Sequence, residues 1–478
     1  MSLKYETVSL GEHLYIKGRI GWKGLKKDEY LDYGNYRIIN ATALEEDGIN
    51  WNDCGYITKE RFDESPEIIL KEKDILISKD GTIGKLGYVK ELHVPSTVAS
   101  GVFVVRNLNK EYIDTDFLYY YFKSPFFKWF IKSVTEGSVI PHLYQRDFID
   151  MEFNLFDLKV QKKCSTILNV IEEKININKR INKNLEDTIL KIFDSWFVKF
   201  ELSNEFSDSK LGLIPKGWKI DYLGSKKSCS IIRSGIDEFD NSKIYVATAD
   251  VDNSIITSND TLITMNDKPS RANMQPIAKS IWFAKMIDSR KLIMIDDYCS
   301  DLLNNYIFST GFCGLKCVDK YFYYLWAFLL TDAFDVMKNN FCTGTTMQAI
   351  NNKDTKLIEF VLPDDNIINQ FNVIAKPMFK KIYYNSLEIK KLQKLRDTLL
   401  PKLMSGEIDV SKINCDLKII IRKIYIKSSK LFLWRYLSEN QNHIKNTKSN
   451  ETLLKSRAIH KINKFLAKFN ARYRYYRQ

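Results

Sequence analysis

The chain has 478 residues, of which 45% are hydrophobic and 27% charged, a composition that excludes wholesale disorder and suits two or more domains. Its longest apolar run, residues 321–330, is about half of what a bilayer span requires, and no signal-peptide core follows Met1. We therefore expect a cytoplasmic protein without membrane contact.

The formal net charge of +13 lies at the C-terminal end of the chain. Residues 417–478 hold 16 Lys and Arg against two acidic residues, a net charge of +14, so the preceding 416 residues sum to −1. The rest of the chain is therefore not a basic body, and any affinity for nucleic acid has to come from local clusters of charge.

Residues 1–155 are predicted to form the first domain. Short runs rich in Ile, Val, Tyr and Phe, such as residues 74–77 and 101–105, are broken by Gly, Asp and Asn and are typical of strands. A loop at residues 78–85 brings hydroxyls and two lysines directly after one of these strands. A second polar segment at residues 135–142 is rich in Thr, Gly and Ser.

A long helix is predicted over residues 156–200. Apolar residues recur at spacings of three and four from Ile167 to Trp196, which is the period of an amphipathic helix. Asn178 falls on this apolar stripe, where one polar residue can select the partner and the register of a helix pair. The alternative is that Asn178 lies on a solvated face.

The second half of the sequence repeats the first after about 206 to 210 residues. Residues 41–43 recur as 247–249, and residues 152–155 recur as 359–362. A whole series of such matches in the same order indicates a duplication. We therefore predict a second domain of the same kind over residues 201–362.

The loops differ between the two halves. Residues 285–291 stand where the first half has its loop 78–85, and they lack the Gly-Thr-Ile-Gly found at residues 81–84. Residues 343–348 form the second Thr/Gly segment. Loops that diverge on matching frameworks favour two recognition surfaces with different targets.

A second long helix is predicted over residues 363–410. Its apolar stripe includes Leu395, and Pro377 is placed to kink or split it. Two stripes of equal length cover each other most simply by pairing, with ordinary core packing as the alternative. The residues expected at the helix pair are Ile171, Asn178, Leu185, Met378, Asn385 and Leu392.

Residues 411–478 form a basic C-terminal extension, which ends with Arg and Tyr alternating at residues 472–477. Three interpretations fit this composition: a nucleic-acid grip, a helix on a membrane surface, or an extension without a selected role. We favour the last, and expect deletion of residues 417–478 to leave the function unchanged.

The sequence shows none of the residue patterns of an active site. Its eight cysteines are scattered, which predicts reduced thiols, and Cys313 and Cys317 have no second pair with which to bind zinc. Residues 388–390 look like the end of a nuclease motif but lie inside the second helix. No glycine-rich phosphate loop follows a strand. We expect no metal, no cofactor and no enzymatic activity in this chain.

The polar loops carry groups that suit DNA, because hydroxyls and cations bind phosphates and Gln or Arg can fork onto base edges. The alternative is that they are surface loops that cap strands. The residues predicted to contact DNA are Lys79, Thr82, Lys85, Ser138, His142, Gln145 and Arg146 in the first half, and Lys285, Arg290, Lys291, Thr345, Thr346, Gln348 and Lys353 in the second.

Several segments share a pattern with a known family. They are the strand and loop at residues 73–84, the polar segment at 137–143, the Ile-Pro-Lys-Gly-Trp at 214–218 and the helix end and turn at 395–408. Over about residues 5–416, the chain resembles the specificity subunits of type I restriction–modification enzymes. It departs from the family pattern in loop 285–291 and in the C-terminal extension.

The resemblance implies an α+β fold in which two duplicated mixed α/β target-recognition domains are separated by two long helices that pair as an antiparallel coiled coil. Each domain would read one part of a bipartite site in duplex DNA, while the helices set the spacing and dock the methyltransferase subunits. The implied partners are two methyltransferase subunits and, in the full complex, restriction subunits that translocate and cut DNA. S-adenosylmethionine, ATP and Mg²⁺ would belong to those partners.

Two other functions are compatible with the residues alone. A non-catalytic scaffold of the same duplicated fold would recruit partners without reading DNA. An independent nuclease or methyltransferase is disfavoured by the missing motifs.

Overall fold

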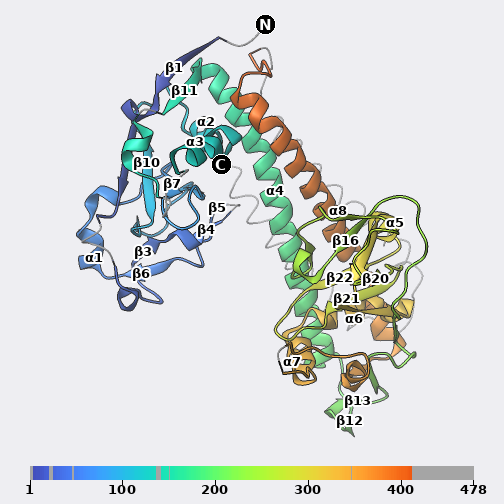
Figure 1. Ribbon diagram of the computed structural model, residues 1–478. Helices are drawn as coiled ribbons and strands as arrows, with labels where there is room; N and C mark the ends of the chain where they lie inside the picture. Colours follow the sequence, from blue (N-terminus) through green and yellow to red (C-terminus); the bar gives the residue numbers. More distant parts are fainter. Residues whose placement is uncertain are drawn as a thin grey trace, which may run out of the picture. The chain divides into compact units, whose positions relative to one another are not determined.

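The computed structural model describes residues 4–20, 25–45, 48–135, 142–149, 151–345 and 347–411. The chain divides into two compact units, each described here by itself. Unit 1 comprises Met1–Val170 with Leu400–Gln478, and unit 2 comprises Ile171–Leu399. In Figure 1 the strands of unit 1 are mainly blue, and those of unit 2 run from green to yellow.

The centre of unit 1 is a four-stranded antiparallel sheet in the order β2-β10-β7-β8. Its strands are β2 (Leu14–Gly18), β10 (Val102–Asn107), β7 (Ile75–Ser78) and β8 (Leu86–Tyr88). All four residues of β7 are buried, as the Ile- and Leu-rich sequence of a central strand predicts. The sheet thus fixes the point at which the loop after β7 begins.

Shorter elements complete unit 1. A three-stranded sheet has the order β6-β3-β9, with β3 and β9 parallel. The strands and helices are β3 (Tyr36–Ile39), β6 (Gly55–Ile57), β9 (Ser96–Val98), the pair β4 (Leu44–Glu45) and β5 (Gly48–Ile49), α1 (Lys59–Asp63), α2 (Thr115–Lys123) and α3 (Pro125–Thr135). Strand β1 (Tyr5–Ser9) pairs antiparallel with β11 (Glu152–Phe156), so the first and last strands of this domain meet.

Unit 2 contains two four-stranded sheets, in the orders β15-β24-β21-β22 and β19-β16-β23-β20. The strands are β14 (Lys219–Tyr222), β15 (Cys229–Ile231), β16 (Lys243–Val246), β17 (Val251–Asp252), β18 (Ile255–Ile256), β19 (Leu262–Ile263), β20 (Ala272–Met274), β21 (Ser280–Ala284), β22 (Leu292–Ile295), β23 (Tyr306–Ser309), β24 (Phe312–Cys317) and β25 (Glu359–Leu362). A separate hairpin joins β12 (Phe206–Ser209) to β13 (Gly212–Pro215). The helices are α5 (Ser300–Asn305), α6 (Phe322–Leu329) and α7 (Asp332–Asn340).

Unit 2 repeats the topology of unit 1. The order β15-β24-β21-β22 corresponds to β2-β10-β7-β8, and the parallel pair β16 and β23 corresponds to β3 and β9. Strand β14 pairs with β25 as β1 pairs with β11, and α6 and α7 follow β24 as α2 and α3 follow β10. The predicted duplication of a mixed α/β domain is therefore confirmed.

The two long helices are α4 (Leu158–Phe193) and α8 (Asp365–Met404), and a π-helical turn at Asp194–Val198 follows α4. Helix α8 is continuous over 40 residues, so of the two effects expected of Pro377, a kink or a split, the split is wrong. The proline removes one helical hydrogen bond, but its neighbours Ala375 and Phe379 are buried in the core of unit 2, and their packing holds both sides of the helix.

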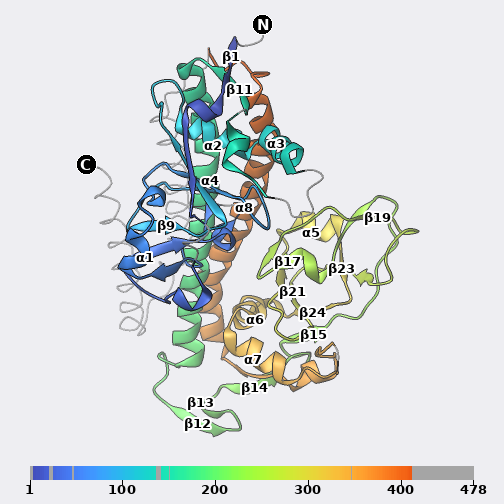
Figure 2. The same cartoon turned by 60° about the vertical axis from the view of Figure 1, so that its left-hand side comes forward.

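Within unit 2, α4 and α8 lie side by side and run antiparallel, as both views show (Figures 1 and 2). Glu172 accepts a hydrogen bond from Arg396 at 3.1 Å. Further along α4, Asn182 accepts one from Asn385 at 2.8 Å, and Asn178 donates one to Glu388 at 2.8 Å. Residue numbers rise along α4 as they fall along α8, which confirms the antiparallel pair.

The residues predicted for the helix pair are all at least partly covered. Ile171, Asn178 and Asn385 are buried, while Leu185, Met378 and Leu392 are half-buried. The prediction that Leu395 belongs to the buried apolar stripe is wrong, because its side chain is 46% exposed. Arg396 is buried in its stead, because its long side chain reaches both Glu172 and Asp397. Among the described residues, every helix is too short or too polar to span a bilayer.

Candidate nucleic-acid interface

The loop between β7 and β8 of unit 1, residues 79–85 and here named L1, closes on itself. The buried Ser78 hydroxyl donates to the Thr82 carbonyl at 2.6 Å and accepts from the Lys85 N–H at 2.8 Å. Gly81 and Gly84 have φ angles of 64° and 83°, which L-amino acids with side chains rarely adopt. One serine and two glycines therefore define the shape of L1.

A second segment of unit 1 lies against L1. The Leu143 N–H donates to the Lys79 carbonyl at 3.1 Å, and His142 pairs with Asp80. The exposed Tyr144 ring packs on the His142 ring, with 4.5 Å between the two ring centres. L1 and residues 142–149 thus form one continuous polar surface.

The corresponding loop of unit 2, residues 285–291 and here named L2, has the same backbone anchors. The Lys285 N–H donates to the Gly311 carbonyl at 2.9 Å, as the Lys79 N–H donates to the Gly101 carbonyl at 2.9 Å. The Lys285 carbonyl accepts from the Ile350 N–H at 2.9 Å, in the same way as Lys79 accepts from Leu143. The two loops therefore begin on equivalent frameworks.

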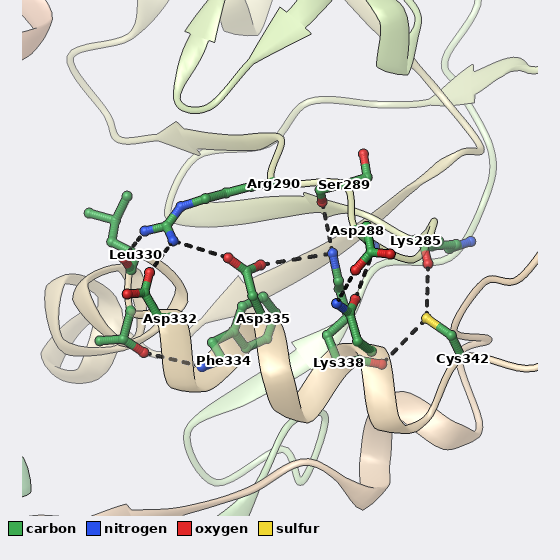
Figure 3. A network of polar contacts seen from close by, with 12 residues as sticks. Lys285, Asp288, Ser289, Arg290, Leu330, Asp332, Phe334, Asp335, Lys338 and Cys342 are labelled. Atoms are coloured by element: carbon green, nitrogen blue, oxygen red, sulfur yellow. Dashed lines mark hydrogen bonds and ion pairs between the residues drawn. The ribbon is translucent and has the colours of Figure 1, made fainter. Parts of the chain in front are cut away.

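L2 is held by α7 (Figure 3). The Lys338 ammonium donates to the Ser289 carbonyl at 2.7 Å, and the Asn339 amide donates to the Asp288 carboxylate at 2.8 Å. The Arg290 guanidinium pairs with Asp332 at 2.5 Å and Asp335 at 3.1 Å and also donates to the carbonyl of Leu330, which lies between α6 and α7. Three consecutive residues of L2 are thus bonded to one helix or to the residues just before it.

Comparison with known proteins shows what the chain is similar to. Residues 3–187 match the family model described as the type I restriction modification DNA specificity domain. The chain is 28% identical over 413 residues to the type I restriction enzyme MjaIX specificity subunit of Methanocaldococcus jannaschii, covering 84% of this chain and 89% of that protein. The chain is thus similar to type I specificity subunits over most of its length.

Two further comparisons cover most of the chain. The type I restriction enzyme HindI specificity subunit of Haemophilus influenzae is 21% identical over 373 residues, or 65% of this chain and 81% of that protein. The crystal structure of a type I restriction–modification S subunit from M. genitalium has a TM-score of 0.52 at 15% identity and covers 84% of this chain and 96% of that one, which supports the fold.

Unit 1 brings most of its predicted DNA contacts to the surface formed by L1 and residues 142–149. Thr82, Gln145 and Arg146 are exposed, and Lys79, Lys85 and His142 are half-buried. Ser138 lies outside the described residues. The Lys79 ammonium lies 5.0 Å from the centre of the Phe103 ring, which fixes its position beside β10.

The sequence interpretation missed Tyr144 in this surface. Its side chain is 49% exposed, and the Arg146 guanidinium lies 4.8 Å from the centre of its ring. An exposed aromatic ring held between His142 and Arg146 is a typical stacking surface for a base or sugar. The sequence His-Leu-Tyr-Gln-Arg at residues 142–146, in which an aromatic residue stands among polar and basic ones, could have indicated Tyr144.

Unit 2 places its predicted cations differently. The Lys285 ammonium donates to the Thr310 carbonyl at 3.1 Å, and the Lys291 ammonium donates to the Thr248 carbonyl at 2.7 Å. Together with Arg290, these half-buried groups each have a partner within their own domain. In unit 2 the other predicted contacts, Thr345, Gln348 and Lys353, are exposed, while Thr346 lies outside the described residues.

Burial sets the electrostatics of the α7 contacts. It lowers the pKa of Lys338, whose side chain is only 1% exposed. Burial also raises the pKa of Asp335, although Lys338 and Arg290 favour its ionised form. Lys338 and Asn339 were missed from the sequence because no local pattern shows which loop a distant helix will hold.

The thiols of the described residues take no part in these contacts, apart from Cys342, whose sulfur lies 3.7 Å from the Lys285 carbonyl. None of the seven described cysteines forms a disulfide bond, and burial raises the pKa of Cys313 to about 12. Within the described part of the chain, no three or more His, Cys, Asp and Glu side chains are grouped to hold a metal ion.

Proposed function

We propose that this specificity subunit reads a bipartite site in duplex DNA, with unit 1 reading one part and unit 2 the other. The observation that carries the proposal is the pair of loops, L1 and L2, which leave equivalent strands through the same backbone hydrogen bonds but present different side chains. A framework that is conserved between two halves while its loops differ is suited to reading two different sequences.

The exposed side chains supply chemistry for such reading. In unit 1, Gln145 and Arg146 can fork onto base edges, and Thr82 can bind a phosphate. In unit 2, the exposed amide of Gln348 can fork onto a base edge, and the exposed ammonium of Lys353 can bind a phosphate. We assign Arg290 to the support of L2, because three oxygen atoms of its own domain already surround its guanidinium.

The helices α4 and α8 are proposed to set the spacing between the two parts of the site. With 36 and 40 residues and a rise of ~1.5 Å per residue, each is about 55 to 60 Å long. We propose domain boundaries at residues 1–155, 156–200, 201–362, 363–410 and 411–478, as the sequence predicts. The basic extension falls outside the described residues beyond residue 411.

The same proposal covers partners and location. A chain that reads DNA without a catalytic centre needs other subunits to modify and cut the DNA. We propose two methyltransferase subunits docked on the helices, and restriction subunits in the full complex. These partners would bind S-adenosylmethionine, ATP and Mg²⁺, and the assembly would act in the cytoplasm, where the chromosome is accessible.

Co-expression with the cognate methyltransferase subunits, followed by sequencing of methylated bases across the host genome, tests the proposal. We expect one methylated motif with two specified parts and a fixed unspecified spacer. An assembled complex that methylates no defined motif would contradict DNA reading and favour a scaffold without recognition.

A further inference from the structure

L2 lacks two features that stabilise the conformation of L1, a serine hydroxyl before the loop and a glycine near its end. Ala284 stands at the end of β21, where unit 1 has the hydroxyl of Ser78 at the end of β7. One residue before the closing lysine, L2 has Arg290 where L1 has Gly84. L2 therefore has neither an internal hydroxyl bridge nor a glycine that lets the loop pack tightly against the neighbouring helix.

Helix α7 holds L2 from outside instead. Lys338, Asn339 and Asp335 of this helix contact Ser289, Asp288 and Arg290 in that order. The Asn339 amide oxygen also accepts from the Asp288 N–H at 3.2 Å, so this pair makes two bonds. Asp288 itself has a φ of 51°, a conformation that is strained for a residue with a side chain and needs such support.

Lys338 is the most deeply buried member of this group. Its side chain is 1% exposed, and its ammonium lies 3.8 Å from the Asp335 carboxylate and 2.7 Å from the Ser289 carbonyl. A buried ammonium costs free energy that an apolar side chain would not. In unit 1, α3 indeed places the apolar Ile131 against its loop, at Gly84. The bond to the backbone of L2 is the specific interaction that only the ammonium of Lys338 provides.

We propose that Lys338 is a positioning residue for DNA recognition by unit 2. By holding the Ser289 carbonyl, it fixes the backbone of L2, whose Ile287 N–H donates to the Gln348 carbonyl at 3.0 Å, and so positions the Gln348 side chain that reads bases in unit 2. The inference rests on the proposed function, and it deepens that function by naming a residue outside the DNA surface that sets the specificity of one half-site.

A purely structural role for Lys338 makes a different prediction. Loss of a structural contact lowers the thermal stability of unit 2 and the yield of the complex, but the molecules that fold still read the same bases. Loss of a positioning contact relaxes the choice of bases in one half-site, while the other half-site and the spacer keep their sequence and length.

The test uses the full chain co-expressed with its cognate methyltransferase subunits. Lys338→Met removes the ammonium and keeps the length of the side chain. Lys316→Met is the matched control, because the Lys316 ammonium also donates to a backbone carbonyl of unit 2, that of Ala278 at 2.7 Å, away from L2. Methylated motifs are sequenced from cells, and methylation rates are measured with purified complexes on duplexes that carry single-base changes.

For Lys338→Met, we expect discrimination in one half of the motif to fall about tenfold, which is the discrimination that one good base contact supplies. The other half and the spacer stay as in the wild type, and Lys316→Met keeps the full motif. An assembled Lys338→Met complex with wild-type discrimination in both halves would overturn the inference.

A second variant covers the case in which Lys338→Met does not fold. Asn339→Ala removes the paired bonds to Asp288 at a half-buried position, and we expect it to relax the same half of the motif. Unchanged discrimination in folded Asn339→Ala would count against the inference. The wild-type complex tests the proposed function separately from the role of Lys338, because its bipartite motif is measured without either variant.

Discussion

L1 and L2 leave equivalent strands through equivalent backbone bonds, yet different chemistry stabilises them. L1 depends on its own residues, a serine hydroxyl and a glycine that packs against the apolar Ile131. L2 depends on the charged and amide side chains of α7. The backbone framework of the two domains and the side-chain contacts that stabilise their loops can therefore change independently. Backbone bonds preserve the framework when side chains change, so each loop is free to acquire its own support and its own target.

The two units differ most in how they hold the lysine that precedes a central strand, β7 in unit 1 and β21 in unit 2. The largest loss of stability is expected from a change at this place in unit 2. Lys73 and Lys279 both have positive φ angles, of 70° and 52°. The side chain of Lys73 is 55% exposed, whereas that of Lys279 is 11% exposed and pairs with the buried Asp296. We expect Asp296→Asn to lower the free energy of unfolding of unit 2 by about 3 kcal/mol, because the Lys279 ammonium loses its buried partner and keeps only the exposed Asp297 carboxylate, at 3.1 Å. Thermal unfolding of the full chain measures this.

The same variant has a defined pH dependence. Burial alone would raise the pKa of Asp296, but hydrogen bonds from Lys279 and Tyr323 outweigh it and hold the pKa below the ordinary value of 3.8. The stabilisation by ionised Asp296 is therefore present above pH 3.8 and is lost as the pH falls through the lower folded-state value. The difference in melting temperature between wild type and Asp296→Asn should shrink below pH 3.8. Asp297→Asn, at a carboxylate that is 70% exposed, serves as the control, and a similar loss there would contradict the account.

A smaller effect is expected from the glycines of L1. Both Gly81 and Gly84 have positive φ, but only at Gly84 would an added Cβ clash, at 2.5 Å from the Cδ1 atom of Ile131. We expect Gly81→Ala to cost about 1 kcal/mol of stability and Gly84→Ala about 2 kcal/mol. Ile131→Val removes Cδ1, so in that background the cost of Gly84→Ala should approach that of Gly81→Ala. A double-mutant cycle in urea unfolding measures the coupling, and additive effects would rule out the clash.

An effect on stability as small as that of Gly81→Ala is expected for Ser78→Ala, which places before L1 the alanine that precedes L2, without the support of α7. Loss of two hydrogen bonds should cost about 1 kcal/mol and relax only the half of the motif that unit 1 reads. Ser96→Ala is the control, since the Ser96 hydroxyl also donates to a backbone carbonyl of unit 1, that of Val94 at 2.8 Å. Methylome sequencing of the two variants gives the answer, and a change in the half read by unit 2 would contradict separate reading.

The framework of the two loops could be predicted from the sequence because its signals are local. Strand-like runs followed by polar residues place L1 and L2, and their spacing along the chain reveals the duplication. The backbone anchors at Lys79 and Lys285 then follow from the shared strand order. The pairing of the two long helices was likewise accessible, because the apolar stripes repeat at helical spacing, whereas their antiparallel direction was implied only by the resemblance to the family.

The support of the loops could not be predicted, because it depends on contacts between distant segments. Arg290 was interpreted as a DNA contact, yet Asp332 and Asp335, some forty residues further along the chain, pair with it. Position on a helical stripe likewise failed to separate Leu395 from Arg396, since burial of Arg396 depends on Glu172 of the other helix. Side-chain pairing of this kind becomes visible only once the fold brings the partners together.

Exchange of residues 1–155 for the corresponding domain of another type I specificity subunit is the most direct test of separate reading by the two units. The hybrid is co-expressed with the cognate methyltransferase subunits, and its methylated motif is sequenced beside that of the wild type. The account predicts a motif in which one half is replaced, while the other half and the spacer length are retained. A hybrid that assembles but changes both halves, or neither, would contradict it.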